Sequence, residues 1–371
     1  MKKRILTVIG ARPQIIKAAA ISRAVRLHFQ DQIQELMLHT GQHYDSNMSR
    51  IFFEELGIPE ADYNLGVGSG SHGAQTALMT EGIEKVLLSE KPDALLIYGD
   101  TNSTLAGALA ASKLHVPVIH VEAGLRSFDK TMPEEINRIV ADHVSTILFA
   151  PTNTALDNLA KEGIISRPVE KHTPDHPLVL KTGDVMYDNA LFYREKISVK
   201  RKTPGSYILA TIHRDHNTDD PLRLRTLLEA LGKAAQATNM MVILPLHPRT
   251  RNRIMIEQTK GWRMPAQIEI MDPVSYLEMI ALESNCSLVI TDSGGVQKEA
   301  YFFKKPCIIL RPHTEWVEIV EHGHATIAGD DPELIVRSAQ RYMQNNEIDW
   351  PDLFGDGHAA ENMIRVILNT I

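Results

Sequence analysis

Acidic side chains close two short apolar runs in the first half of the chain. Asp100 follows the run at 94–98, Glu122 follows the run at 118–121, and Glu134 lies a few residues beyond. If both runs are parallel strands, their carboxyl ends meet at one edge of a sheet and aim these carboxylates at one place. Converging carboxylates repel one another and lose water, which raises one pKa and supplies the acid and base of proton transfer. The alternative is structural, with Asp100 as a helix N-cap and the others in surface ion pairs.

Histidines beside arginines follow two apolar runs in the second half. His213 and Arg214 come after the run at 207–212, and His247 precedes Arg249 in ILPLHPRT. A single histidine is usually structural. Two such pairs at strand ends instead indicate a site that handles protons and phosphates.

The segment TDSGGVQKEA, residues 291–300, joins an apolar run to an expected helix. Ser293, Gly294 and Gly295 are small, so the amides of the helix start can form a nest for a diphosphate. Glu299 is then placed to reach a ribose hydroxyl. One alternative is a plain turn in which Ser293 caps the helix. The other is the DSGG of trypsin-like proteases, which the strand-to-helix position disfavours because those enzymes are disulfide-bearing β-barrels.

Two cations lie near the start of the chain in GARPQIIK. Arg12 and Lys17 follow the first apolar run, at 5–9, where α/β sheets present ligands. A cation in the first turn of a helix opposes the helix dipole, which indicates an anionic partner. The alternative is a solvated helix start.

Neither a metal nor a dinucleotide is expected. The chain has 16 histidines but no HExxH or comparable ligand spacing. Gly68, Gly70 and Gly73 spell GxGxxG, with Asp93 twenty residues beyond Gly73. This pattern follows the weak run YNLGV rather than the leading strand, so we interpret it as a mobile glycine-rich loop at a cleft mouth.

Short apolar runs alternate with longer amphipathic segments, which is typical of βαβ units around parallel sheets. The expected strands are 5–9, 35–39, 94–98, 118–121 and 146–149, followed by 207–212, 242–244, 268–270, 288–290 and 307–310. The series restarts once. We therefore predict an α/β fold of two Rossmann-like domains whose parallel sheets face a central cleft.

Segment 166–181 contains three prolines and mixed charges, which favour an exposed insertion. We place the hinge just after it. The expected parts are an N-terminal domain at 1–181 with the acidic residues, a C-terminal domain at 182–355 that binds the phosphates, and a helix at 356–371 that crosses back to the first domain.

Composition limits the cellular role. A net charge of -7 argues against nucleic-acid binding, which needs a basic face. Cys286 and Cys307 lack CxxC spacing, so we expect buried free thiols in the cytoplasm. The first apolar run is too short for a signal peptide, and no run approaches the roughly 18 residues of a membrane span.

Nine motifs occur in the order seen in UDP-N-acetylglucosamine 2-epimerases: GARPQIIK, GQHYD, YGDTNSTLAG, HVEAGLRS, MPEEINR, TGDVMYD, TDSGGVQKEA, TEWVE and FGDGHAA. The chain resembles this non-hydrolysing family along nearly its whole length. The resemblance implies a glycosyltransferase-B-like fold, no added cofactor, and inversion at C2 of a UDP-activated 2-acetamido sugar for bacterial surface polysaccharides. It also implies elimination of UDP to a 2-acetamidoglycal, followed by re-addition.

The same resemblance implies roles for individual residues. The acid/base and cleavage-assisting residues are Asp100, Glu122, Glu134 and His213. The substrate contacts are Arg12, Lys17, Arg138, His247, Ser293, Gly294, Gly295, Glu299, Arg311 and Trp316. Which carboxylate takes the proton stays open.

Two departures bear on the substrate. Gln14 stands where typical members carry Glu, and Trp316 stands where they carry an arginine in TERPE. Positions linked to activation by substrate are also poorly matched around GQHYDSNMS and GVGSGSHG. These differences are more like a subgroup acting on UDP-2,3-diacetamido-2,3-dideoxyglucuronate, which is the close alternative to UDP-N-acetylglucosamine.

Three further alternatives remain at the sequence level. They are a hydrolysing 2-epimerase that releases N-acetylmannosamine and UDP, a glycosyltransferase of the same fold, and a nucleotide-sugar binding module without catalysis. By analogy with the family we also expect a homodimer.

Overall fold

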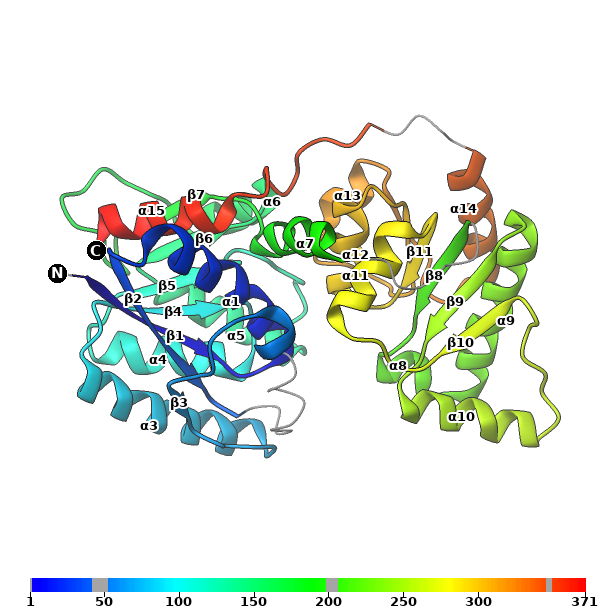
Figure 1. Cartoon of the computed structure of the whole chain (residues 1–371), viewed down its shortest axis with the longest axis horizontal. Helices are drawn as coiled ribbons and strands as arrows, with labels where there is room; N and C mark the ends of the chain where they lie inside the picture. Colours follow the sequence, from blue (N-terminus) through cyan, green and yellow to red (C-terminus); the bar gives the residue numbers. More distant parts are fainter. Residues whose placement is uncertain (1, 42–52, 198–205, 345–348) are drawn as a thin grey trace. The chain divides into compact units, whose positions relative to one another are not determined.

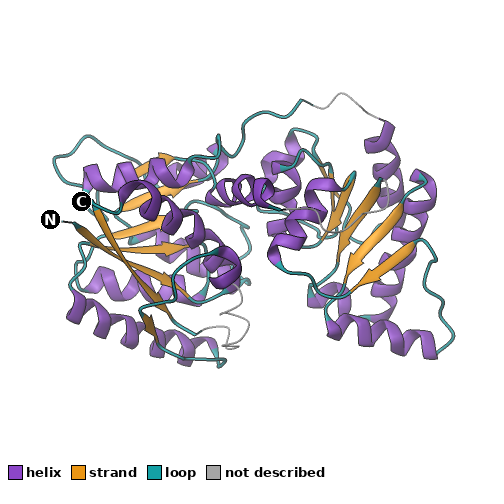
Figure 2. Ribbon diagram, viewed as in Figure 1, coloured by secondary structure: helices purple, strands orange, loops and turns teal. Residues whose placement is uncertain are grey.

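The computed structural model describes residues 2–41, 53–197, 206–344 and 349–371. The chain forms two compact units (Figure 1). Unit 1 comprises Met1–Asn189 together with Asp352–Ile371, and unit 2 comprises Ala190–Pro351. Each unit is an α/β layer structure with helices on both faces of a parallel sheet (Figure 2).

The sheet of unit 1 has seven parallel strands in the order β3-β2-β1-β4-β5-β6-β7. The strands are β1 (Lys3–Ile9), β2 (Ile33–His39), β3 (Tyr63–Asn64), β4 (Ala94–Tyr98), β5 (Val118–Val121), β6 (Ile147–Ala150) and β7 (Leu178–Lys181). This is the strand order of a Rossmann fold, with the change of direction between β1 and β4. Every residue of β4, β5 and β6 is buried, as strands covered on both faces require.

Helices cover both faces of this sheet. They are α1 (Arg12–Ala24), the π-helix η1 (Val25–Phe29), α3 (His72–Glu90), α4 (Asn102–Lys113), α5 (Pro133–His143), α6 (Asn153–Lys161) and α15 (Ala359–Thr370). Helix α7 (Val185–Lys196) begins in unit 1 and ends in unit 2. Helix α4 is rich in alanine and packs closely on β4, because even a Cβ at Gly107 would lie 3.0 Å from Ile97 Cγ2.

The sheet of unit 2 has six parallel strands in the order β10-β9-β8-β11-β12-β13. The strands are β8 (Tyr207–Thr211), β9 (Met241–Pro245), β10 (Ile268–Met271), β11 (Leu288–Thr291), β12 (Cys307–Ile309) and β13 (Ala325–Ile327). The helices are α8 (Asp215–Thr218), α9 (Pro221–Thr238), α10 (Pro248–Thr259), α11 (Tyr276–Asn285), α12 (Gly294–Phe302), α13 (Val317–Glu321) and α14 (Pro332–Gln344).

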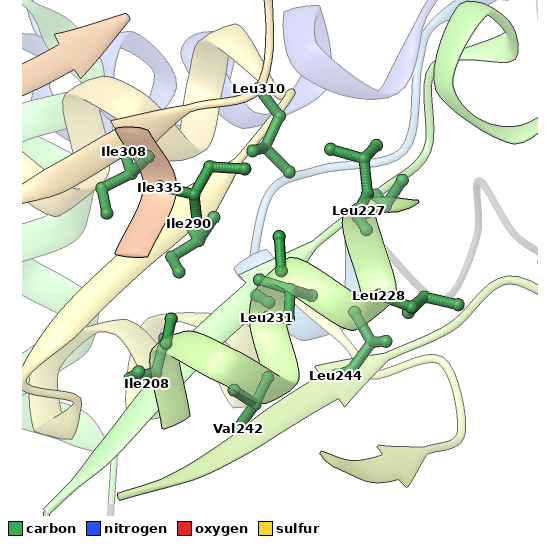
Figure 3. Close-up of a cluster of buried hydrophobic side chains, with 14 of the residues drawn as sticks. Ile208, Leu227, Leu228, Leu231, Val242, Leu244, Ile290, Ile308, Leu310 and Ile335 are labelled. Atoms are coloured by element: carbon green, nitrogen blue, oxygen red, sulfur yellow. The ribbon is translucent and has the colours of Figure 1, made fainter. Parts of the chain in front are cut away.

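A hydrophobic core lies between this sheet and helices α9 and α14 (Figure 3). Leu227 and Leu231 of α9 and Ile335 of α14 meet strand residues such as Ile208 and Ile290. All five side chains are fully buried, which accounts for the apolar stripe of both helices. This rigid layer fixes the strand ends that carry the polar residues described below.

The last helix packs within unit 1. The carboxylate of Asp188 in α7 accepts hydrogen bonds from the backbone N–H groups of Ala359 (3.1 Å) and Ala360 (2.8 Å) at the start of α15. Burial raises the pKa of Asp188 to about 6, against the opposing effect of these two amides. Helix α15 therefore depends on a side chain that precedes it by 171 residues.

The segment predicted as an exposed insertion is only partly so. Residues 165–171 are exposed, but Leu178–Lys181 pairs with β6 as the edge strand β7. Three prolines obscured this short strand. Cys286 and Cys307 are buried free thiols, as predicted, and burial raises the pKa of Cys286 to about 12. Among the described residues, no helix combines the length and apolarity needed to cross a membrane.

Candidate active site

A buried ion pair lies at the carboxyl edge of the first sheet. Lys17 of α1 donates a hydrogen bond to the carboxylate of Glu122, which directly follows β5. Both groups contact Gly99 in the turn after β4, because a Cβ there would lie 3.0 Å from Lys17 Nζ and 3.2 Å from Glu122 Oε2. Two predicted site residues from separate motifs are thus brought together.

The backbone of Glu122 is strained. Its φ is 72°, in the left-handed region that non-glycine residues rarely occupy. The amides of Glu122 and Ala123 both donate to the carbonyl of Phe149, at 3.1 and 3.0 Å, and so hold this turn. Such strain persists only where the surroundings enforce it, and it clusters at functional positions.

Asp100 lies in the turn after β4 and is held by α5. Its carboxylate, about one-third exposed, pairs with the buried guanidinium of Arg138. Arg138 also binds Glu135 at 2.7 Å, and Glu135 accepts the backbone amides of Ser127 and Phe128 at 2.9 Å each. Thr101, rather than Asp100, caps helix α4. Asp100 is therefore not the N-cap of the structural alternative.

The expected repulsion between carboxylates is offset by cations. Burial alone would lower the pKa of Arg138, but the charges of Asp100 and Glu135 raise it overall. Glu134 is half-buried in the first turn of α5, on the same helix as Glu135 and Arg138. The structure thus distinguishes the two neighbouring glutamates, because the fully buried Glu135 is committed to Arg138 and to backbone amides.

His120 is a further residue of this edge that the sequence motifs did not single out. It is fully buried in β5, where Nδ1 lies 2.7 Å from Asp142 and Nε2 lies 2.8 Å from the carbonyl of Gly99. Burial would raise the pKa of Asp142, but hydrogen bonds and charge from His120 and Arg126 lower it. The pair His120 and Asp142 therefore fixes the turn that carries Asp100.

Gln14 has a structural role that explains its position. Its Oε1 accepts the amides of Gly10 (2.9 Å) and Ala11 (3.1 Å), and its Nε2 donates to the carbonyl of Tyr98 (3.0 Å). It ties the turn before α1 to the end of β4. Arg12 is exposed at the first position of α1, two residues before Gln14.

In unit 2, Asp292 positions His213. This fully buried carboxylate accepts the backbone amides of His213 (3.1 Å) and Arg214 (3.0 Å) and the side-chain amide of Asn217 (2.9 Å). His213 is an exposed residue just beyond the end of β8. The motif TDSGG contains Asp292, but sequence reasoning assigned no role to it, because only the fold brings β8 beside β11.

The start of α12 gathers five of the predicted substrate contacts, namely Ser293, Gly294, Gly295, Arg311 and Trp316. Trp316 donates from Nε1 to the carbonyl of Gly294 at 3.0 Å. Arg311 forms a bidentate ion pair with Glu315, with N–O distances of 2.9 and 3.1 Å. Both side chains lie within 4 Å of a Cβ built on Gly294. Ser293 is the N-cap residue, yet within the described chain its hydroxyl makes no capping bond to this helix. The plain capping alternative therefore does not account for Ser293.

A buried cation adjoins this cluster. The ammonium of Lys298 lies 4.5 Å from the ring centre of Trp316, and only 2% of Lys298 is exposed. A cation held against an aromatic face is attracted by the ring quadrupole. The subsite at Gly294 thus combines a helix start, the cation of Lys298 and the Arg311–Glu315 ion pair. Backbone amides at a helix start suit an anionic ligand.

Glu299 lies among buried acidic groups. Burial, followed by the charge of Glu299, raises the pKa of both Glu283 and Tyr276 well above their usual values. Gly295 is adjacent, since a Cβ built on it would lie 4.0 Å from Glu299 Oε2. Burial thus favours the protonated forms of Glu283 and Tyr276 beside Glu299.

His247 has a structural role. It caps α10, where its Nδ1 accepts the amide of Arg249 at 3.3 Å. Arg249 in turn forms exposed ion pairs with Asp215 and Asp219. His247 is a predicted substrate contact that the structure does not bring into the cluster at Gly294.

Several predicted features lie elsewhere. Residues 42–45 of GQHYD fall outside the described residues. A groove of about 730 Å³ between α3, α4 and α5 contains none of the predicted site residues; it is lined by residues such as Thr76, Leu105 and Ile136. In the described ranges, no three His, Cys, Asp or Glu side chains gather as a metal site would require.

The sequence pattern of a family described as UDP-N-acetylglucosamine 2-epimerase matches residues 26–368. A Pseudomonas aeruginosa protein named UDP-2,3-diacetamido-2,3-dideoxy-D-glucuronate 2-epimerase is 49% identical, over 98% of this chain and 99% of its own length.

Two solved structures share the fold. The UDP-GlcNAc 2-epimerase of Methanocaldococcus jannaschii, in complex with UDP-GlcNAc and UDP, is 42% identical and has a TM-score of 0.84, with 99% of each chain covered. That of Neisseria meningitidis, bound to UDP-GlcNAc, is 27% identical with a TM-score of 0.83, covering 99% of this chain and all of its own. The predicted class, two Rossmann-like domains of glycosyltransferase-B type, is confirmed by this likeness.

Proposed function

Because this chain belongs to the UDP-N-acetylglucosamine 2-epimerase family, we propose that it inverts the configuration at C2 of a UDP-activated 2-acetamido sugar without hydrolysing it. One observation carries the proposal. The carboxylates of Asp100 and Glu122 follow adjacent strands, and each is paired with a buried cation, Arg138 or Lys17. Carboxylates fixed in position at one edge of a sheet can act as the general acid and base that proton transfer at a sugar carbon requires.

The proposed reaction passes through elimination. A carboxylate from Asp100, Glu122 or Glu134 takes the proton from C2. The electron pair forms a C1=C2 bond, and the C1–O bond breaks so that UDP leaves with its electrons. UDP then attacks C1 again while C2 receives a proton on the opposite face. We propose that the diphosphate binds at Gly294 and Gly295 and that His213 assists its departure.

We further propose that UDP-2,3-diacetamido-2,3-dideoxyglucuronate is turned over faster than UDP-N-acetylglucosamine. The Pseudomonas relative supports this choice by its identity of 49%.

The experiment is incubation of the purified protein with each UDP-sugar in deuterated water, followed by proton NMR. The expected result is interconversion of the two C2 epimers with solvent deuterium at C2. Epimers without deuterium would exclude the elimination mechanism. Free sugar and UDP would favour a hydrolysing enzyme, and turnover only after addition of an acceptor would favour a glycosyltransferase.

Two variants separate an enzyme from a binding module. Asp100→Asn and His213→Ala are expected to lower kcat by about 10² to 10⁴, while the Kd for UDP changes little. Asp157→Asn, an exposed carboxylate on α6, is the matched control and retains full turnover. If both site variants turn over like the control, these residues have no part in the chemistry.

A further inference from the structure

Three buried side-chain amides form a continuous hydrogen-bonded chain in unit 1. Asn137 of α5 donates to Oδ1 of Asn102 at 3.2 Å, and Asn102 donates to Oε1 of Gln75 at 2.8 Å. Gln75 of α3 then donates to the carbonyl of Gly68 at 2.7 Å. Each side-chain N–H group donates to the oxygen of the next residue, so all three hydrogen bonds point from Asn137 towards Gly68.

The three amides are buried, and Asn102 and Asn137 also line the groove between α3, α4 and α5. Asn137, Asn102 and Gln75 are 4%, 7% and 7% exposed, respectively. A buried amide that loses a partner keeps the full cost of its desolvation, so the three amides are stable only as a satisfied set. Side chains from three different helices are thereby held in fixed relative positions.

One end of the chain reaches the predicted catalytic turn. Asn137 Nδ2 also donates to the backbone carbonyl of Asp100 at 2.9 Å. The next residue of the same helix, Arg138, binds the carboxylate of Asp100. Helix α5 therefore holds both the main chain and the side chain of Asp100, and a shift of Asn137 must shift both.

The other end reaches the glycine-rich loop GVGSGSHG. Gly68 accepts from Gln75 and donates its own amide to the carbonyl of Gly41 at 2.9 Å, so the loop is docked on both sides. His72, the first residue of α3, also lies 3.2 Å from Asn102 Nδ2. This loop follows the edge strand β3 rather than β1, which is not the position of a dinucleotide-binding loop in a Rossmann fold.

We propose that Gln75, Asn102 and Asn137 are positioning residues. Through their hydrogen bonds, the docking of the glycine-rich loop at Gly68 determines the position of Asp100. None of the three is a catalytic residue. Each acts through the backbone or side chain of another. The consequence for turnover rests on the proposed epimerase function, whereas the mechanical coupling does not.

The test uses Gln75→Glu in the full chain. A glutamate accepts a hydrogen bond from Asn102 as glutamine does, but it cannot donate one to the carbonyl of Gly68. The substitution therefore removes only the hydrogen bond to the glycine-rich loop. We expect hydrogen–deuterium exchange to accelerate both at 66–70 and at 99–105. We also expect kcat to fall by about 10- to 100-fold with a smaller change in KM, since a small misplacement of a reacting group has that effect.

A double-mutant cycle provides the second measurement. If the amides act as one unit, Gln75→Glu combined with Asn137→Ala lowers kcat no more than the stronger single variant. The matched control is Asn158→Ala, which removes a buried amide that holds the carbonyl of Gly124 at 3.1 Å outside the chain. It should lower the melting temperature without accelerating exchange at 99–105.

Two results would overturn the proposal. One is faster exchange of Gln75→Glu at 66–70 alone with unchanged kcat, and the other is multiplicative losses in the double variant. If the wild-type protein epimerises no UDP-sugar, the proposed function fails, but exchange at 99–105 still decides whether the loop and Asp100 are coupled.

Discussion

Lys17 and Glu122, which are 105 residues apart in the sequence, form an ion pair that rests against the backbone of Gly99. The two side chains are 10% and 8% exposed, so neither can be removed without leaving a buried charge. This one ion pair therefore joins the turn at Gly99, helix α1 and the end of β5.

Gly99→Ala should disturb both the fold and the activity. Its φ is 61°, and the added methyl would press on Lys17 Nζ and Glu122 Oε2. We expect a loss of about 1–3 kcal/mol in the free energy of unfolding, measured with urea. We also expect kcat for C2 inversion to fall at least about tenfold, since displaced reacting groups have such effects.

Gly57→Ala is the control for this change. Gly57 has the same φ of 61°, but nothing lies within 4 Å of a Cβ built there. It should lose only the backbone contribution, about 1–2 kcal/mol, and keep its kcat. Equal effects of the two substitutions on kcat would mean that the contact at Gly99 is unimportant for turnover.

Asp292→Asn should release the turn that carries His213. The carboxylate accepts three N–H groups, and an amide replaces one acceptor by a donor. We expect a loss of about 1.5–3 kcal/mol in stability and a fall in kcat larger than the rise in KM. Asp220→Asn is the control, because it caps α9 through two amides. Activity of Asp292→Asn as high as that of this control would refute the assigned role.

Trp316→Phe should weaken UDP binding. The change removes the donor to the carbonyl of Gly294 but keeps an aromatic ring near Lys298. A lost hydrogen bond of about 1 kcal/mol corresponds to roughly a fivefold higher Kd, which calorimetry with UDP can measure. Trp262→Phe removes a comparable bond, to Glu229 at 2.9 Å, and should leave the Kd unchanged. A Kd unaltered in both variants would contradict this subsite.

The stability of unit 1 should carry a pH dependence from Asp188. Burial raises its pKa to about 6 from an ordinary 3.8, so the native state keeps a proton that the unfolded chain has lost. The stabilising contribution is therefore complete below about pH 4 and is lost as the pH rises through 6. The shift corresponds to about 3 kcal/mol.

The corresponding measurement is urea unfolding of wild type and Asp188→Asn between pH 4 and pH 7. The variant cannot ionise, so its stability relative to wild type should increase across this range. A difference that is independent of pH would mean that Asp188 ionises normally in the native state.

The sheets were predictable because buried parallel strands leave continuous apolar runs. All ten expected strands are present, with ends shifted by at most two residues. The short edge strands Tyr63–Asn64, Leu178–Lys181 and Ala325–Ile327 were missed. Edge strands are half-exposed and brief, so their patterns resemble those of loops.

The candidate site was predictable only as separate motifs. Chain order places Asp100, Glu122 and Ser293 after strands, and the structure has each of them there. Their buried partners could not be found in this way. The contacts of His120 with Gly99, and of Asp292 with His213, join side chains to backbone groups on neighbouring strands, and such contacts leave no sequence pattern.

The hydrogen bonds from Ala359 and Ala360 to Asp188 also bear on synthesis of the chain. Unit 2 is continuous in sequence, whereas unit 1 needs α15, which leaves the ribosome after all of unit 2. The domain begun first is thus completed second. Until α15 is synthesised, its docking surface on the nascent first domain stays exposed. Chaperones can bind such an exposed surface during translation.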